Sequence, residues 1–299
     1  MSSAQPRDYT LPTDNLRGAL WMLASAACFT VMASCLKLLA ERGFAESQMV
    51  FFRCAVGFVL MLPLARRNPR AVWSVARPWV MARRCVASAV GLLLAFFAFA
   101  NMPIATAQAL SFSRSLFVVV LAMIFAQERV GVWRRSAVVV GFVGVMVMLR
   151  PTEFHVDWAA GAMLASALLS AYTVLTVKDL TRDHSTITLV FWLNASTALI
   201  GLPLAIGAWK TPLGFDLGLF VLMAVAGFLA QSFFTLGLTR GEASAMTMLD
   251  YLRMPMAVLA SFVVFHVAPD GWTYAGAAIV IASSIFITLR EAHLARRPV

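Results

Sequence analysis

The run GALWMLASAACFTVMASCLKLLA, residues 18–40, is 23 residues long and contains a single charged side chain, Lys37. A helix needs about 20 mostly apolar residues to cross a bilayer, so this run predicts a membrane-spanning helix. It is too long for the apolar core of a secretory signal peptide, and no obvious cleavage site follows it. Residues 1–16 are polar and contain acids and two prolines. We therefore expect a retained membrane helix that follows a polar tail.

Nine further apolar runs follow, joined by short polar connections. The chain is 61% hydrophobic and 13% charged, with a mean hydropathy of +0.82, whereas soluble domains are about 25% charged. No connection has room for a soluble domain. The expected fold is therefore an all-α integral membrane protein with ten transmembrane helices. The expected spans are 18–40, 48–65, 79–100, 103–126, 133–149, 158–177, 187–208, 216–238, 244–267 and 272–289.

Basic residues are distributed unevenly between the two sides of such a bundle. With the N-terminus in the cytoplasm, 17 Lys and Arg residues fall in cytoplasmic segments, and three, Arg42, Arg150 and Lys210, fall outside. Cytoplasmic loops of membrane proteins carry this excess of positive charge. We therefore expect a multi-pass protein of the cell inner membrane with both termini in the cytoplasm. The same distribution explains the net charge of +10 without a nucleic-acid partner.

The chain also resembles itself. MLASA occurs at 22–26 and again at 163–167, LPLA occurs at 62–65 and 202–205, and further matches keep offsets within 137–141 residues. Because the matches are co-linear, they predict two repeats of five helices each. Five spans is an odd number, so the second repeat starts on the opposite side of the membrane and is inverted, as in many secondary transporters. The expected organisation is an N-terminal tail (1–16), repeats 17–150 and 157–290, and a C-terminal tail (291–299).

Several stretches resemble the drug/metabolite transporter superfamily, in its ten-helix EamA-type branch. They are ATAQALSFSRSLFVVVLAMIF at 105–125, Glu128-Arg129, the G-x-x-G-V pattern at Gly141–Val145, and RMPMAVLASFVVFHVAPDGWTYAGAAIVIASS at 253–284. The resemblance covers nearly the whole chain. It implies an exporter of small metabolites, often amino acids, or of toxic compounds.

The resemblance has two departures. Pro255 stands where the family often has a proline, but the first repeat has Ser115 or Leu116 at the matching place. The segment His266 to Pro269 stands where a glutamate is common. These departures leave open whether the two repeats bend alike at these helices.

Polar side chains inside a bilayer need partners, and ionisable ones are functional candidates. Several lie at helical spacing, which places them on one face of a span; that face meets either a neighbouring helix or a substrate cavity. Aromatic side chains in the spans favour an uncharged or cationic cargo over a sugar phosphate. We expect a substrate cavity lined by Phe97, Gln108, Ser111, Phe112, Tyr172, Thr173, Gln231, Phe234, Thr247 and Tyr251.

The most unusual stretch is TMLDYLRMPM, residues 247–256, because it places charges inside an apolar span. Asp250 and Arg253 are three residues apart, so they can pair on one helix face. Pro255 has no N–H, which removes the helical partner of the Tyr251 carbonyl and predicts a kink. Asp250 then either faces the cavity, where it meets a substrate ammonium or carries a proton, or forms a structural clip with Arg253.

The remaining patterns bear on the reaction. No G-x-x-x-x-G-K-[ST] motif is present, so direct use of ATP is not expected. The four histidines are scattered and no H-E-x-x-H or G-x-S-x-G occurs, which argues against an enzyme, and no cofactor or metal is expected. We expect a secondary transporter with alternating access that exports small amphipathic metabolites, with amino acids, including aromatic ones, as the best guess. A multidrug or cationic toxic-compound transporter is the alternative; the partners are a small molecule and the bilayer, and a monomer suffices.

Overall fold

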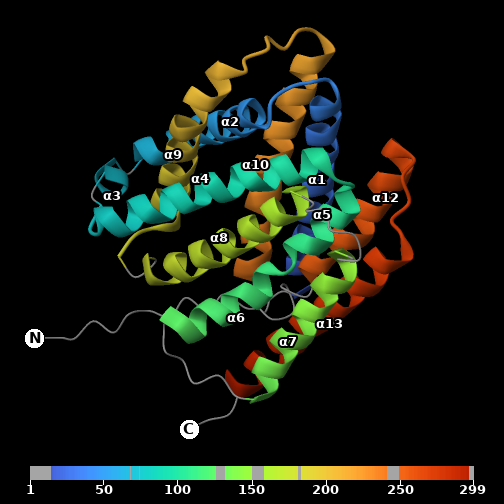
Figure 1. Ribbon diagram of the computed structural model, residues 1–299. Coiled ribbons are helices and arrows are strands. Elements are labelled where there is room, and N and C mark those ends of the chain that lie inside the picture. The colour runs from blue at the N-terminus through green and yellow to red at the C-terminus, as the bar shows by residue number, and fades with distance from the viewer. Residues whose placement is uncertain are drawn as a thin grey trace, which may run out of the picture.

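The computed structural model describes residues 15–67, 69–73, 75–125, 132–149, 158–180, 183–240 and 249–295. Regular secondary structure in this part of the chain is entirely helical (Figure 1). The first half contains α1 (Asn15–Glu41), α2 (Glu46–Arg67), α3 (Pro69–Trp73), α4 (Pro78–Asn101), α5 (Ile104–Ser111), α6 (Arg114–Phe125) and α7 (Val132–Leu149). The second half contains α8 (Trp158–Leu180), α9 (Thr186–Gly207), α10 (Phe215–Arg240), the 3-10 helix η1 (Asp250–Leu252), α12 (Arg253–Phe265) and α13 (Gly271–Ala295).

Seven stretches within the described helices are long and apolar enough to cross a membrane. They lie in α1, α2, α4, the combined α5–α6 segment, α8, α9 and α10. Shorter apolar stretches lie in α7 and α13. The helices therefore fall where the apolar runs predicted them, and α12 occupies part of the expected span 244–267.

The ends of two helices follow local sequence signals. α4 begins with Pro78, which lacks the N–H that a first turn leaves unpaired. α12 ends at His266, whose φ of 54° is left-handed. The N–H of His266 donates to the carbonyl of Phe262, and the N–H of Val267 donates to the carbonyl of Ser261. This is the bonding of a Schellman cap, so the departure at His266 marks the end of a helix.

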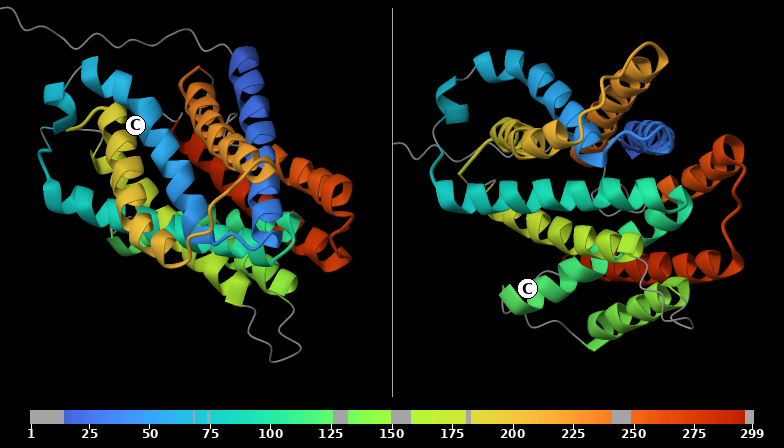
Figure 2. Two further views of the ribbon diagram at one scale, coloured as in Figure 1. Left: turned by 90° about the horizontal axis from the view of Figure 1, so that it is seen from above. Right: turned by 45° about the horizontal axis from the view of Figure 1, so that its top comes forward.

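Helices from the two halves of the chain pack against each other in four pairs. α1 lies along α10, α4 along α8, α2 along α9 and α7 along α13 (Figure 2). The first pair joins the first helix of one half to the third long helix of the other, and α4 with α8 is the reverse arrangement. The two halves are therefore interleaved.

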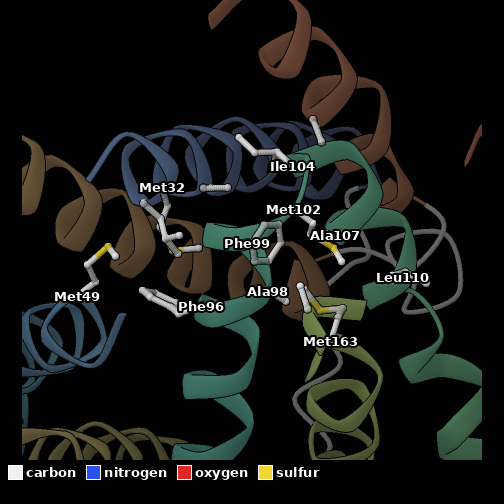
Figure 3. Close-up of a cluster of buried hydrophobic side chains, with 14 of the residues drawn as sticks. Met32, Met49, Phe96, Ala98, Phe99, Met102, Ile104, Ala107, Leu110 and Met163 are labelled. Atoms are coloured by element: carbon white, nitrogen blue, oxygen red, sulfur yellow. The ribbon is translucent and has the colours of Figure 1, made fainter. Parts of the chain in front are cut away.

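The largest hydrophobic core lies at one end of the bundle, which we call the Gln48 end. It takes side chains from both halves, including Met49 of α2, Phe96 of α4, Met163 of α8 and Phe220 of α10. Figure 3 shows Met32, Met49 and Phe96 close together, with Phe99, Met102 and Met163 continuing the cluster. One continuous core thus ties the two halves together at this end.

The hydrophobic clusters toward the opposite end are smaller and separate. One joins α6, α7 and α13, a second joins α4, α8 and α9, and a third joins α2, α3 and α9. There, α1 and α10 pack on each other through Trp21 and Phe233, whose ring centroids are 5.1 Å apart. The bundle is therefore more tightly joined at the Gln48 end than at the other.

Candidate functional site

An aspartate and two arginines meet where η1, α6 and α12 come together. Arg253 Nε lies 2.7 Å from Asp250 Oδ1, and Arg114 Nη2 lies 3.9 Å from Asp250 Oδ2. The N–H of Arg253 is not directed at that oxygen as a hydrogen bond requires, so the contact is ionic. The Asp250 and Arg253 side chains are 9% and 14% exposed, whereas that of Arg114 is 42% exposed. Asp250 is therefore buried and shared, and Arg114 is the accessible member.

The guanidinium of Arg253 is enclosed by side chains from α1 and α10. It lies 4.7 Å from the ring centroid of Phe29 and 5.3 Å from that of Phe234. Its Nη2 donates to Ser25 Oγ at 3.4 Å, and that hydroxyl donates to the carbonyl of Ala230 at 2.8 Å. Aromatic faces attract cations, so Phe29 and Phe234 already hold a cation of the protein itself.

An aromatic residue precedes each arginine by two positions, and these two aromatic rings touch. The centroids of Phe112 and Tyr251 are 4.8 Å apart, with an interplanar angle of 57°. Phe112 and Arg114 lie 139 residues before Tyr251 and Arg253, an offset within the range of the internal repeat. The site therefore contains an aromatic-x-Arg element from each half of the chain.

Both helices that carry these elements are interrupted at the element. In the second half, 3-10 geometry at Asp250–Leu252 precedes α12, and its Tyr251 carbonyl is the one that Pro255 leaves without a helical partner. In the first half, the expected single span 103–126 is divided between α5, which ends at Ser111, and α6, which begins at Arg114. No proline stands at this second interruption.

Serines explain the interruption in the first half. Ser111 Oγ donates to the carbonyl of Gln108 at 2.6 Å, Ser113 Oγ to Leu110 at 2.6 Å, and Ser115 Oγ to Phe112 at 2.8 Å. Such bonds to the preceding turn compete with the helical N–H groups and bend helices. The repeats therefore bend at matching positions by different means, proline in one and serines in the other.

Tyr251 is also linked to polar groups of α6 and α13. Ser115 Oγ and Ser284 Oγ are 2.5 Å apart, and the Tyr251 hydroxyl interacts with both serines. Gln108 is 2% exposed, and its Nε2 donates to Ser111 Oγ at 3.2 Å. Its Oε1 has no hydrogen-bond donor among the described residues. Gln108, Ser111, Phe112 and Tyr251 therefore lie along the α5–η1 side of the candidate site.

The other residues expected to line the cavity are more dispersed. Thr173 Oγ1 is 3.2 Å from Ser88 Oγ in the contact between α8 and α4, and Tyr172 precedes it on α8. Gln231 is exposed on α10, and Phe97 is 36% exposed on α4. Phe234 contacts the Arg253 guanidinium, and Thr247 lies outside the described residues. Only Phe234 of this second set joins the Asp250–Arg253 cluster through a described contact.

Arg114 was recognisable as one of four basic residues within expected spans, but nothing in its own surroundings placed it beside Asp250. The signal that could have done so is the repeated aromatic-x-Arg, FSR at 112–114 and YLR at 251–253. Arg53 of α2 is another such residue. Its guanidinium is 5.9 Å from the Phe96 ring centroid, and its Nε has no partner among the described residues. A charge at the centre of a membrane helix costs roughly 2.5–3.5 kcal/mol on the insertion scale.

Polar contacts join the two halves at the Gln48 end. Gln48 is fully buried; its Nε2 donates to the carbonyl of Lys210 at 2.7 Å, and its Oε1 accepts the Lys210 backbone N–H at 3.2 Å. Arg42 Nη1 pairs with Asp216 Oδ1 at 2.8 Å. These contacts close the same end of the bundle as the continuous hydrophobic core.

A second set of polar contacts joins α3 and α4 to α8 and α9 at the opposite end. Arg77 pairs with Asp179 at 2.8 Å and with Asp183 at 2.7 Å. The hydrogen bond to Asp179 raises the pKa of Arg77 above its ordinary value, so the arginine keeps its charge. His184 Nε2 accepts the N–H of Ala76 at 3.0 Å. This set leaves α1 and α10 outside the joined group.

Within the described ranges, no three His, Cys, Asp or Glu side chains come close enough to hold a metal ion. The site is instead a cluster of charged, aromatic and hydroxyl groups at a contact between the two halves of the chain.

Residues 16–150 and 157–289 each match the EamA-like transporter family. The chain belongs to the EamA-like transporter family. This confirms the resemblance seen in the sequence and identifies a membrane transporter. The family matches cover almost the whole chain and separate at the connection between α7 and α8.

Characterised relatives carry several different cargoes. A riboflavin transporter of Rhizobium johnstonii is 32% identical over 96% of both chains. An S-adenosylmethionine uptake transporter of Rickettsia felis is 29% identical over 92% of this chain and 94% of its own. A pseudopaline exporter of Pseudomonas aeruginosa is 25% identical over 91% and 95%. A crystal structure with 17% identity superposes with a TM-score of 0.60 over 91% of this chain and 98% of its own, so it shares the fold.

Proposed function

We propose that this protein is a secondary transporter in which two inverted five-helix repeats enclose a central substrate site and work by alternating access. The interleaved pairs α1–α10 and α4–α8 support inversion, because exchanging the two halves exchanges the pairs. The matching interruptions beside Phe112 and Tyr251 support a binding site near the middle of the membrane, where such transporters hold their substrates. The distribution of basic residues supports an inner-membrane protein with cytoplasmic termini.

In that orientation, the Gln48 end faces outward. Its continuous core and the Gln48–Lys210 contacts then close the outer side, while the separate clusters lie on the cytoplasmic side. The site would be reached from the cytoplasm in this conformation. Transport then requires the Gln48 end to open while the opposite end closes.

The observation that carries the cargo proposal is the Phe112–Tyr251 aromatic pair beside Arg114 and Asp250. Aromatic pairs offer stacking faces, and the charged groups offer hydrogen bonds to a polar edge. Riboflavin presents a planar ring system with a polar edge, and a relative named as a riboflavin transporter is 32% identical. We therefore propose a flavin, riboflavin, as the cargo.

Aromatic amino acids are the second candidate. Asp250 and Arg114 lie 3.9 Å apart and together complement the ammonium and carboxylate groups of a zwitterion. The resemblance in the sequence leads us to expect such amino acids, moved outward. Riboflavin and phenylalanine are therefore the two probes that a transport assay must compare.

We would reconstitute the full chain in proteoliposomes and follow labelled riboflavin and labelled phenylalanine in both directions, with and without an imposed pH gradient. Saturable riboflavin flux supports the proposal, and flux of phenylalanine alone transfers it to amino acids. Absence of both fluxes in folded protein contradicts the cargo proposals. Asp250→Asn, measured in parallel, decides between the two roles of Asp250. Loss of gradient stimulation indicates coupling, whereas gradient-independent flux that survives the substitution indicates a structural pair with Arg253.

A further inference from the structure

The candidate site carries more positive than negative charge. Two guanidiniums, of Arg114 and Arg253, share the single carboxylate of Asp250, at 3.9 Å and 2.7 Å. No other carboxylate lies within ion-pair distance of either arginine among the described residues. Asp250 can neutralise one of the two, so one positive charge of the cluster is left without a counter-ion.

The two arginines are not equivalent in their surroundings. Arg253 is 14% exposed and is occupied by Asp250, by Ser25, and by the rings of Phe29 and Phe234. Arg114 is 42% exposed, and its one described polar contact is the long one to Asp250. The guanidinium with free donor groups is therefore Arg114, although the two occupy equivalent positions of the repeat.

The exposed part of Arg114 cannot face lipid comfortably. It lies near the middle of the apolar stretch Ile104–Ile124, where a charged group in contact with hydrocarbon is strongly disfavoured. Intramembrane arginines instead face a water-filled passage or another polar group. Its exposure therefore places it on the side of the site that water and substrate reach.

Cations have little to bind in this site. The aromatic faces of Phe29 and Phe234, which the sequence suggested for a cationic cargo, lie beside the Arg253 guanidinium. An entering cation would also meet the surplus charge of Arg114. Like charges brought together at a binding site lower affinity and exclude the wrong partner.

Resting on the proposed transport function, we propose that this site selects its substrate by charge. Arg114 binds an anionic or electron-rich polar group on a planar ring system, the Phe112–Tyr251 pair packs against the ring, and substrates with net positive charge are rejected. The chemical class is thus neutral or anionic planar aromatics, with Arg114 as the residue that contacts the polar edge.

The test uses three tricyclic probes of similar size that differ in charge: neutral riboflavin, anionic riboflavin 5′-phosphate and cationic proflavine. Each is titrated by fluorescence against the purified full chain, and each is then assayed for flux in proteoliposomes. The wild type is expected to bind riboflavin and its phosphate and to bind proflavine at least about 10-fold more weakly, the factor carried by one charge-assisted hydrogen bond.

Substitution of Arg114 makes the test specific to this residue. Arg114→Gln is expected to weaken binding of both flavins by about 10- to 100-fold, since a hydrogen bond to a charged group is lost. Arg114→Glu is expected to reverse the order, so that proflavine binds more tightly than riboflavin. Arg83→Gln, an exposed arginine on α4, is the matched control and is expected to change no affinity. Melting temperatures are measured for each variant to show that it is folded.

Three results would overturn the proposal. Proflavine bound and transported as well as riboflavin would leave a transporter but remove selection by charge. Unchanged flavin affinity in folded Arg114→Gln would remove Arg114 from the site. Absence of binding and flux for all three probes in folded wild type would contradict the flavin cargo itself, and with it the role assigned to Arg114.

Discussion

The rings of Phe112 and Tyr251 lie 4.8 Å apart, although 139 residues separate them in the chain. They occupy equivalent positions in the two halves, so their contact lies on the relation that exchanges the halves. Each is followed two residues later by an arginine, and each stands at a helix interruption. The contact therefore marks the point where the two halves meet in the same way from both sides.

A residue pair at such a position would feel any movement of one half against the other. Backbone at a helix interruption lacks some of its helical hydrogen bonds, so it can be satisfied by other groups or by a ligand. In the first half the freed carbonyls are taken by Ser111, Ser113 and Ser115. The two halves of the site therefore differ in stiffness as well as in charge.

Removing one ring tests the aromatic platform. Tyr251→Ala is expected to weaken riboflavin binding by about 2- to 12-fold, the range for loss of one aromatic contact beyond its buried area. Tyr251→Phe keeps the ring and should retain most of the affinity. Trp79→Ala removes an aromatic residue that is 71% exposed at the start of α4, and it should have no effect. Equal losses in Tyr251→Ala and Trp79→Ala, measured by fluorescence titration, would contradict a specific platform.

The buried ion pair predicts a stability effect that is not additive. Asp250→Asn and Arg253→Gln each leave a buried charge unpaired, which destabilises a protein by roughly 3–5 kcal/mol. The double substitution removes both charges and should cost less than the sum of the two. The free energy of unfolding in detergent, measured for all four proteins of the cycle, gives the coupling. The exposed Arg42–Asp216 pair is the control, with an expected coupling of about 0–1 kcal/mol.

Much of the fold could be predicted because it depends on local composition. An apolar run of fixed length specifies a spanning helix wherever it occurs, and α8 at Trp158–Leu180 differs from its expected span only by a few residues at one end. The interruption between Ser111 and Arg114 was harder to predict. It depends on serine hydroxyls that bond to the turn before them, and serine inside a helix often makes no such bend.

The candidate site could be predicted only in part, for a related reason. The spacing of Asp250 and Arg253 makes them neighbours on any helix turn, so their pairing follows from sequence alone. The contacts of Arg253 with Ser25 and Phe29 depend on how α12 packs against α1, more than 220 residues away. No local spacing encodes that contact. Arg114 lies between the two cases, because its equivalence to Arg253 is visible in the repeat but its contact with Asp250 is not.

The contact between α7 and α13 predicts a glycine that tolerates no side chain. A Cβ at Gly144 would lie 2.9 Å from the carbonyl oxygen of Gly276 and 2.9 Å from Ile279 Cβ. Backbone cannot move aside as a flexible side chain can, so Gly144→Ala should destabilise the protein by about 1–3 kcal/mol. Gly161→Ala, in α8, meets nothing within 4 Å and should be neutral or stabilising by up to about 1 kcal/mol. Similar melting temperatures for the two variants would contradict this close packing.

The Gln48 end supplies the prediction that bears most directly on movement. The Gln48 amide makes two hydrogen bonds to the backbone of Lys210, and Cys54 lies fully buried further along α2. Gln48→Ala removes both bonds, each worth about 0.5–1.5 kcal/mol, so the open form of this end should be populated roughly 5- to 100-fold more. In protein whose other three cysteines are replaced by serine, a polar maleimide should therefore label Cys54 faster by a similar factor, because labelling requires opening. Ser47→Ala is the matched control, since it removes an exposed hydrogen bond to the carbonyl of Leu204 and leaves the Gln48 contacts intact. Equal labelling rates in Gln48→Ala and Ser47→Ala would mean that the Gln48–Lys210 contacts do not hold this end closed.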